Sequence, residues 1–219
     1  MVWCVTDFDG RRAEEVLGWL SPHEFDRARR FRDERARWRY VITRAALRDL
    51  LASELGGAPQ DPVIEADPQG KPVLIGPPYD LQFNVSHSRD LALIVFQRGN
   101  SVGIDVEVAD AAVAPSLLRR VCTFTEFAAL KDASDEERRQ QFLRYWVRKE
   151  AVAKADGRGL RLDFATIDVS ATGPVHVPGR TGRATIEVED LAVGDTHVAA
   201  LANAGPVTAP VWRRWSPHH

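Results

Sequence analysis

Two acidic side chains lie two residues apart in the segment Val102–Val108, VGIDVEV. Successive side chains of a strand point to opposite faces, so the apolar residues share one face and Asp105 and Glu107 share the other. Two like charges about 6–7 Å apart repel each other unless a positive group lies between them. Mg²⁺ binds carboxylate oxygens and completes its shell with waters and substrate phosphates. The spacing therefore fits a magnesium site, and two solvent-facing acids are the simpler alternative.

A third carboxylate occurs in the helical segment 142–160, FLRYWVRKEAVAKADGRGL. Glu150 follows Trp146 by four residues, on or beside the apolar stripe, and Lys154 follows one turn later. A carboxylate on the packed side of a helix is costly unless it is paired or bound to a metal. Glu150 could be a third metal ligand, or it could form an ordinary helical ion pair with Lys154. Lys149 is rotated by about 100° from Glu150 and should not face the same site.

Glu126 belongs to the sequence Thr123-Phe-Thr-Glu126, which has the pattern of a capping box. The two readings are a structural cap at the start of a helix and a carboxylate that orients a metal-bound water.

Residues 83–88, FNVSHS, are expected to end one strand and turn into the next. Asn84, Ser86 and His87 would supply hydrogen-bond donors there for a phosphate group. The alternative is a turn whose polar groups bond the local backbone.

The net charge of the chain is −2, yet residues 27–48 carry nine arginines. A local basic patch on a nearly neutral protein favours a small phosphorylated ligand or an acidic partner over nucleic acid. Arginine is suited to bidentate phosphate contacts, although most of these arginines should form a solvated helix face. The turn Gly70-Lys71-Pro72 presents a lysine. Phosphate-binding P-loop, dinucleotide-binding, nucleophile-elbow and zinc-ligand spacings are absent from the sequence.

Hydrophobic patterning and turn residues predict an α+β protein. A helix should begin at Ser21-Pro22, and the arginine-rich helix should end at Gly56-Gly57. Further helices are expected at 115–121, 124–132 and 136–156. Strands are expected at 2–8, 63–66, 71–75, 81–85, 91–96 and 101–108, with several short strands over 162–212. This order predicts two α+β halves that meet near residues 105–112.

The N-terminal residues do not resemble a signal peptide, and the longest central apolar run, Leu91–Phe96, is too short to span a membrane. The two cysteines, Cys4 and Cys122, are far apart. We therefore expect a cytoplasmic protein with reduced thiols and no membrane partner.

Five motifs occur in a characteristic order: GKP at 70–72, FNVSHS at 83–88, VGIDVE at 102–107, FTEFAAL at 124–130 and WVRKEAVAKADGRGL at 146–160. With SPHEFDRARRF at 21–31, they resemble the 4′-phosphopantetheinyl transferase family, specifically its long, monomeric, surfactin-synthetase-activating type. The similarity covers roughly residues 20–165.

The resemblance implies a pseudo-dimer of two similar α+β halves with coenzyme A in the cleft between them. Residues 1–105 would form the half that holds the adenosine and phosphates. Residues 106–219 would carry the metal-ligand helix and face the carrier protein, with about 157–188 touching it. The reaction would transfer the phosphopantetheine arm to a serine of an apo acyl or peptidyl carrier protein, releasing adenosine 3′,5′-bisphosphate. The carrier could serve fatty-acid, polyketide or nonribosomal-peptide synthesis.

The resemblance also implies residue roles. Asp105, Glu107 and Glu150 match ligands of Mg²⁺, with Mn²⁺ as an alternative. Glu150 or Glu126 would accept the proton of the carrier serine, and Lys154 would protonate the leaving phosphate. The remaining matches would contact coenzyme A: Asn84, Ser86 and His87 at the phosphates, and Lys71, Arg39 and Arg27 around the adenosine and its 3′-phosphate.

One residue departs from the pattern: Glu24 stands where the family type member has lysine, and an acid there is expected to weaken the 3′-phosphate clamp. Two other functions would share part of these features: a magnesium-dependent nucleotide pyrophosphatase that uses water, and a non-catalytic module that binds coenzyme A or a carrier protein.

Overall fold

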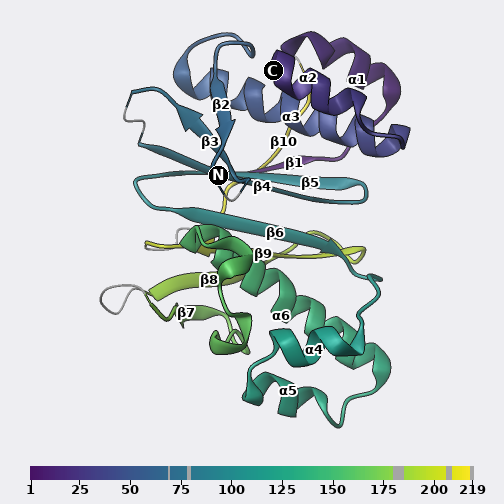
Figure 1. Cartoon of the computed structure of the whole chain (residues 1–219), viewed down its shortest axis with the longest axis vertical. Coiled ribbons are helices and arrows are strands. Elements are labelled where there is room, and N and C mark those ends of the chain that lie inside the picture. Colours follow the sequence, from purple (N-terminus) through teal and green to yellow (C-terminus); the bar gives the residue numbers. More distant parts are fainter. Residues whose placement is uncertain (69, 78–79, 180–184, 206–208, 218–219) are drawn as a thin grey trace.

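The computed structural model describes residues 1–68, 70–77, 80–179, 185–205 and 209–217, and it consists of two α+β halves placed one above the other (Figure 1). The predicted α+β class with two similar halves is confirmed. The upper half contains β1 (Val2–Val5), α1 (Gly10–Val16), α2 (Pro22–Arg29), α3 (Glu34–Leu55), β2 (Val63–Ala66), β3 (Pro72–Ile75), β4 (Leu81–Ser88) and β5 (Leu91–Arg98). The lower half contains β6 (Val102–Val108), α4 (Pro115–Val121), α5 (Phe124–Leu130), α6 (Asp135–Asp156), β7 (Gly173–His176), β8 (Thr185–Leu191) and β9 (His197–Asn203).

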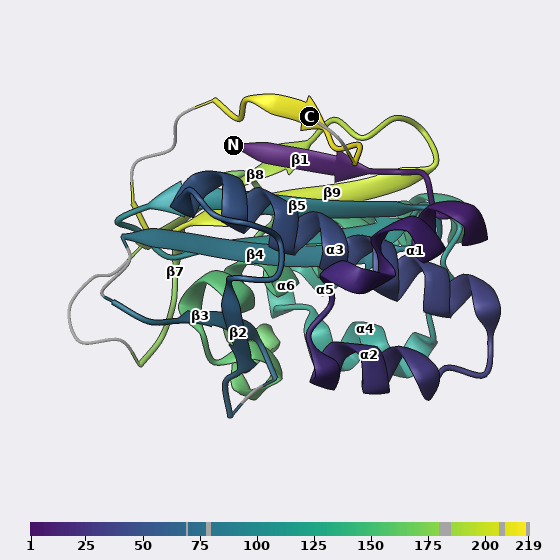
Figure 2. The ribbon, with the colours of Figure 1, turned by 90° about the horizontal axis from the view of Figure 1, so that it is seen from above.

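Each half has one four-stranded sheet and one 22-residue helix. The strand order is β10-β1-β5-β4 in the first sheet and β6-β9-β8-β7 in the second, and β2 and β3 form a separate hairpin. The short strand β10 (Trp212–Arg214) pairs in parallel with β1, beside which it runs in Figure 2.

The boundary between the halves differs from the predicted division into 1–105 and 106–219. All of β6 pairs with β9, so the second half begins before Val102, and a cut after residue 105 would divide one strand. The C-terminal segment then returns to the first half: the backbone N–H of Trp215 donates to Cys4, and its indole Nε1 donates to Asp49 Oδ2 at 2.9 Å. Sequence patterns did not indicate this return, because the pairing joins parts of the chain that lie far apart in the sequence.

Helix α2 begins at Pro22 and α3 ends before Gly56, as predicted, and the structure adds capping groups that the sequence analysis did not identify. Ser21 and Glu24 form a capping box at the start of α2, and Ser134 and Glu137 form another at α6. Both long helices end at a glycine in the left-handed region, Gly56 with φ 78° and Gly157 with φ 88°. Helix α1 was not expected from the sequence, although Asp9 caps it by accepting from the N–H of Arg12.

Strand β4 is longer than predicted: it continues through Ser88, and only Arg89 and Asp90 form the turn into β5. Arg89 adopts a φ of 48°, which is uncommon for a non-glycine residue. The FNVSHS motif therefore lies within a strand. Its side chains alternate between two faces of that strand, which determines what each of them contacts.

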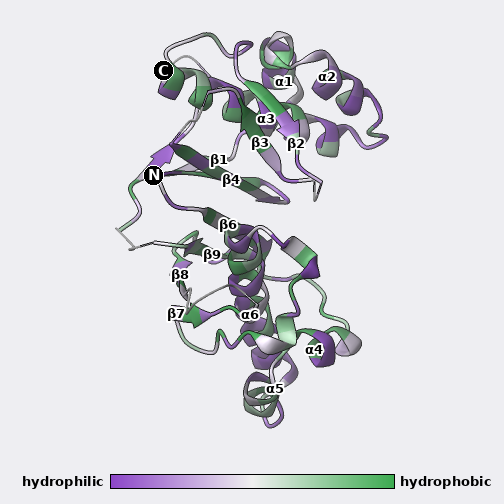
Figure 3. Ribbon diagram, turned by 60° about the vertical axis from the view of Figure 1, so that its left-hand side comes forward, coloured by the Kyte–Doolittle hydropathy of each residue, from purple (hydrophilic) through white to green (hydrophobic). Residues whose placement is uncertain are grey.

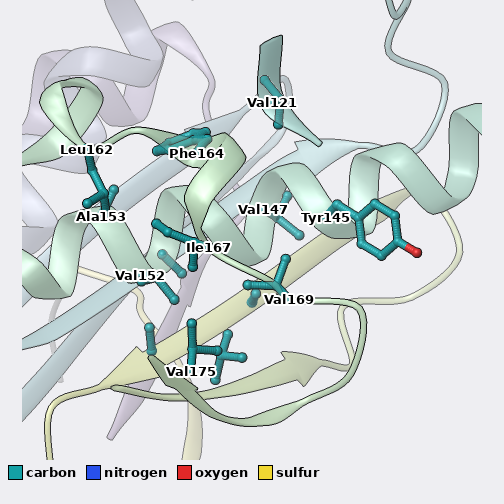
Figure 4. Close-up of a cluster of buried hydrophobic side chains, with 14 of the residues drawn as sticks. Val121, Tyr145, Val147, Val152, Ala153, Leu162, Phe164, Ile167, Val169 and Val175 are labelled. Carbon is teal, nitrogen blue, oxygen red and sulfur yellow. The ribbon is translucent and has the colours of Figure 1, made fainter. Parts of the chain in front are cut away.

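Among the described residues, the buried apolar side chains form three clusters, one within each half and one between the sheets. In the second half, Tyr145 and Val147 of α6 belong to the same buried cluster as Ile167 and Val169 (Figure 4). Between the sheets, Leu93 of β5 belongs to the same cluster as Ile104 of β6. Figure 3 shows α2, by contrast, as mainly hydrophilic. In the described part of the chain, none of the helices combines the length and apolarity that crossing a membrane requires.

Candidate active site

Helix α6 lies directly against the backbone of β6, and Gly103 permits this approach. A β-carbon at residue 103 would collide with the carbonyl oxygen of Ala151 and would lie 2.6 Å from the backbone nitrogen of Ala155. Asp105 and Glu107 share the strand face of Gly103, so their side chains point towards α6.

Successive turns of α6 meet the two acids of β6. Lys154 Nζ donates to Asp105 Oδ1 at 2.7 Å and to the carbonyl oxygen of Ile104 at 2.9 Å. One turn earlier, Glu150 interacts electrostatically with both Asp105 and Glu107. One turn earlier again, Trp146 is hydrogen-bonded to Glu107. The helical repeat thus places a cation, a carboxylate and an indole along the acidic face of the strand.

Burial and neighbouring carboxylates raise the pKa of Glu150 and of Glu107. The pKa of Glu150 is raised to about 7, first by burial and then by the charge of Asp105, with Glu107 adding to the effect and Lys154 opposing it. Burial and Asp105 also raise the pKa of Glu107. Asp105 is 5% exposed, and its Oδ2 is buried without a hydrogen-bond partner among the described residues. A divalent cation would relieve the repulsion and supply the partner that Oδ2 lacks, so these residues fit a metal.

In the described residues, no group of three or more His, Cys, Asp or Glu side chains is already arranged to hold a metal ion. Asp105 Oδ1 is bound by Lys154 and by Ser86 Oγ. A cation held by all three acids would therefore use Asp105 Oδ2, which has no hydrogen-bond partner among the described residues, with Glu150 turning towards the acids of β6. Mg²⁺ is usually bound by one or two carboxylates together with waters and substrate phosphate oxygens.

Two of the predicted phosphate contacts are instead engaged with β6. The hydroxyl of Ser86 donates to Asp105 Oδ1 at 2.8 Å and accepts from the N–H of Val106 at 3.3 Å. Asn84 is 3% exposed, and its Oδ1 accepts from the N–H of Ile104 at 3.0 Å. Both side chains are thus engaged with β6, and phosphate contact by Asn84 or Ser86 stays a prediction. The expectation of a turn at this motif was wrong, and the alternating pattern N-x-S-x-S was the feature that could have revealed the strand.

His87 lies on the face of β4 opposite to Asn84 and Ser86, near basic side chains. Although part of its side chain is open to solvent, the pKa of His87 is lowered by partial burial and, next, by the charge of Arg39, with Lys154 adding to the effect. Arg39 donates through Nη1 to the carbonyl oxygen of Arg89 at 2.9 Å. The structure thus brings His87, Arg39 and Lys154 into one electrostatic environment.

Lys71 reaches the same region from the β2–β3 hairpin. Its Nζ donates to the carbonyl oxygen of Lys154 at 3.2 Å, near the C-terminal end of α6. The pKa of Lys71 is lowered by burial, while Asp67 opposes this and Lys154 adds to it. Sequence reasoning identified this lysine from its turn but could not indicate its contact with α6.

Arg27 is placed apart from these contacts. Its guanidinium lies 5.4 Å from the centre of the Tyr40 ring, on an open surface that also includes His23, Arg30 and Phe31.

Glu24 is not an open acid beside Arg27. It is 3% exposed and binds Arg44 at 2.7 Å and Arg48 at 2.6 Å. Its charge is balanced inside the first half, so the expected weakening of a phosphate clamp by Glu24 is not supported.

Glu126 lies outside the acidic group around Asp105. It is fully buried, and its Oε2 pairs with Lys149 Nζ at 2.6 Å. Its other contacts are with the N–H groups of Thr123 and Val169. The capping-box reading is confirmed. These contacts give Glu126 a structural role at the start of α5, and its catalytic role stays a prediction.

Comparison with known proteins identifies the family. Residues 101–202 match the model of the 4′-phosphopantetheinyl transferase superfamily, and residues 11–98 match that of the 4′-phosphopantetheinyl transferase N-terminal region. The chain is 33% identical over 197 residues to the 4′-phosphopantetheinyl transferase HetI of Nostoc sp., covering 88% of this chain and 81% of the relative. It is 28% identical to a phosphopantetheinyl transferase of Thraustochytrium sp., covering 94% of this chain and 79% of the relative.

A mouse relative, L-aminoadipate-semialdehyde dehydrogenase-phosphopantetheinyl transferase, is 29% identical over 72% of this chain and 55% of its own length. Together with the two-part family match, these similarities show that the chain belongs to the 4′-phosphopantetheinyl transferase superfamily and is a transferase enzyme. Membership in the surfactin-synthetase-activating type stays a prediction.

Proposed function

We propose that this enzyme transfers the 4′-phosphopantetheine arm of coenzyme A to a serine of an apo carrier protein and releases adenosine 3′,5′-bisphosphate. The observation that carries the proposal is the grouping of Asp105, Glu107 and Glu150 beside Lys154 at the junction of the two halves. Cleavage of a pyrophosphate requires neutralisation of the phosphate charges, which acidic groups that bind a cation and basic side chains can provide.

Asp105, Glu107 and Glu150 are the proposed ligands of Mg²⁺, for which Mn²⁺ could substitute. When bound, the ion would neutralise charge on the pyrophosphate oxygens and hold them in line for displacement. The unpartnered Oδ2 of Asp105 and the mutual repulsion of the acids support this assignment.

Glu150 is the proposed base for the carrier serine. A serine hydroxyl is a weak nucleophile and needs a base within hydrogen-bond reach, directly or through water. As the serine oxygen bonds to the phosphorus that bears the pantetheine, its proton passes to Glu150. The bond from that phosphorus to the bridging oxygen breaks, and Lys154 Nζ is the proposed donor of a proton to the leaving phosphate.

Coenzyme A is proposed to lie across the junction with its phosphates towards His87 and Lys154 and its adenosine towards Lys71 and Arg39. The shared electrostatics of His87, Arg39 and Lys154 support this orientation. Arg27 would contact the 3′-phosphate only if the nucleotide extends to the surface beside Tyr40.

The carrier protein is proposed to approach the second half along 157–188, of which residues 180–184 lie outside the described part of the chain. A pocket of about 350 Å³ there is lined by Arg120, Arg161, the 79% exposed Leu160 and Trp146. Trp146 also bonds Glu107, so a protein bound at this pocket would lie next to the acids. Exposed basic and apolar groups suit an acidic partner with an apolar contact.

The direct test is to incubate the enzyme with coenzyme A, Mg²⁺ and apo carrier proteins of the fatty-acid, polyketide and peptide types. The expected result is a mass gain of one phosphopantetheine arm on a carrier serine, with release of adenosine 3′,5′-bisphosphate. Asp105→Ala should retain the circular dichroism spectrum and lose transfer. Cleavage of coenzyme A without a carrier would indicate a pyrophosphatase, and no gain on any carrier would refute the proposal.

A further inference from the structure

Three polar side chains of β4, spaced two residues apart, join the first sheet to the second. Asn84 Oδ1, Ser86 Oγ and Ser88 Oγ accept from the backbone N–H groups of Ile104, Val106 and Val108 at 3.0, 3.3 and 3.2 Å. β4 and β6 are edge strands of two different sheets, so these side chains take the place that a neighbouring strand's carbonyls would occupy. We call this row the β4–β6 seam.

The two serines of the seam each make a second bond, to an acid. Ser86 Oγ donates to Asp105 Oδ1 at 2.8 Å, and Ser88 Oγ donates to Glu107 Oε2 at 3.1 Å. A hydroxyl has one proton. Because the N–H of β6 occupies a lone pair of the hydroxyl oxygen, that proton is directed at the carboxylate. Each serine thereby fixes the orientation of one acid with a hydrogen bond to a charged group.

Ser88 is itself held in place. Its carbonyl oxygen lies 3.2 Å from Nε2 of His197, a residue of β9 that is 7% exposed. The other ring nitrogen of His197 lies 3.0 Å from Thr196 Oγ1. Ser88 is therefore fixed from the second half on two sides: by β6 through its hydroxyl and by β9 through its carbonyl.

We infer that Ser88, together with Ser86, is a positioning residue that holds Glu107 and Asp105 in the orientation needed to bind a divalent cation. The ligands lie on the second half, whereas the groups that orient them lie on the first. Cation affinity should consequently depend on the seam. This inference rests on the cation site of the proposed function.

The experiment measures cation binding by the enzyme without coenzyme A, by calorimetry with Mg²⁺ and by electron paramagnetic resonance with Mn²⁺. Loss of a hydrogen-bonding partner of a metal ligand typically weakens metal binding roughly 10- to 100-fold, and we expect that loss for Ser88→Ala. Ser88→Thr keeps the hydroxyl on a residue suited to strands and should restore most of the affinity. Ser88→Cys keeps the approximate size of the side chain but replaces the hydroxyl with a much weaker donor, so this variant should also bind the cation weakly. It serves as the test if Ser88→Ala folds poorly.

Ser101→Ala is the matched control. Ser101 lies just before β6, and its Oγ donates to the carbonyl oxygen of Ala155 in α6 at 2.6 Å, so the variant loses a serine bond to α6 without affecting an acid. It should bind Mg²⁺ as the unmodified enzyme does. In turnover assays, Ser88→Ala should need more Mg²⁺ for half-maximal rate yet approach the normal kcat at saturating Mg²⁺.

The outcomes distinguish failure of the proposed cation site from failure of the positioning role of Ser88. If Asp105→Ala binds the cation normally, the cation site of the proposed function is wrong, and the positioning role fails with it. If Asp105→Ala loses binding while Ser88→Ala and Ser88→Cys bind as Ser101→Ala does, only the positioning role is overturned. A fall in kcat for Ser88→Ala at saturating Mg²⁺ with unchanged cation affinity would also overturn it.

Discussion

Glu126 and Lys149 are both fully buried and form an ion pair that ties α5 to α6. Removing one partner of a buried pair leaves the other uncompensated, which typically costs about 3–5 kcal/mol. We therefore expect Glu126→Gln to lower the free energy of unfolding by about that amount, measured by urea denaturation. Turnover per folded molecule should stay close to normal. A large loss of kcat in a variant of normal stability would instead support the catalytic role of Glu126.

The ion-paired carboxyl of Glu24 should make the free energy of unfolding depend on pH. Burial acts to raise its pKa, but Arg44, the N–H of Ser21 and Arg48 together hold the pKa below the ordinary value of 4.5. A carboxyl with a lowered pKa in the folded state stabilises the fold above its unfolded pKa, and this contribution is lost as pH falls through the folded pKa.

The difference in unfolding free energy between the unmodified enzyme and Glu24→Gln should therefore be largest above pH 4.5 and shrink as the pH falls below that value. Urea denaturation of both proteins across this range measures it. A difference that is constant with pH would mean that Arg44 and Arg48 do not lower the pKa of Glu24.

At the scale of elements, the contact between α6 and β6 sets the spacing of the site. A methyl group at Gly103 would meet the backbone of α6, which cannot move aside as a flexible side chain would. Overpacking typically costs about 1–3 kcal/mol, and here it should also shift Lys154 and Glu150 away from Asp105. Gly103→Ala is thus expected to lower both stability and kcat.

Gly18→Ala is the control for this substitution, because a β-carbon there would meet nothing within 4 Å. It should leave both stability and kcat nearly unchanged. Normal stability and kcat in Gly103→Ala would show that α6 has room to move away from β6 without disturbing the acids.

Local chemistry made several elements predictable from the sequence. The start of α2 at Ser21-Pro22 and the end of α3 at Gly56-Gly57 were predicted because such signals depend on residues nearby in the chain. The alternation in β6 likewise indicated which side the acids face. The polar end of β4 was misassigned because its serines are satisfied by β6, about twenty residues later in the chain. Glu126 was ambiguous for a similar reason, since its partner Lys149 lies on another helix.

For the whole molecule, the C-terminal segment is the feature that sequence patterns could not place. Strand β10 and Trp215 complete the first half, although the preceding strands belong to the second. A division of the chain into consecutive halves therefore leaves the first half without its outer strand and without a buried indole. The two halves should depend on each other for stability, because the first half is completed by the end of the chain.

Trp215 tests this dependence. It is 2% exposed, belongs to the core cluster of the first half and donates to Asp49. Trp215→Ala should cost about 3–5 kcal/mol, as removal of a buried aromatic side chain typically does. Trp215→Phe keeps most of the ring volume but loses the bond to Asp49 and should cost less. If the halves unfold together, circular dichroism and calorimetry should show one transition that moves to lower temperature in both variants. A new transition at lower temperature beside an unshifted one at higher temperature would mean that the halves unfold separately. The β4–β6 seam and the pairing of β10 with β1 argue against that outcome.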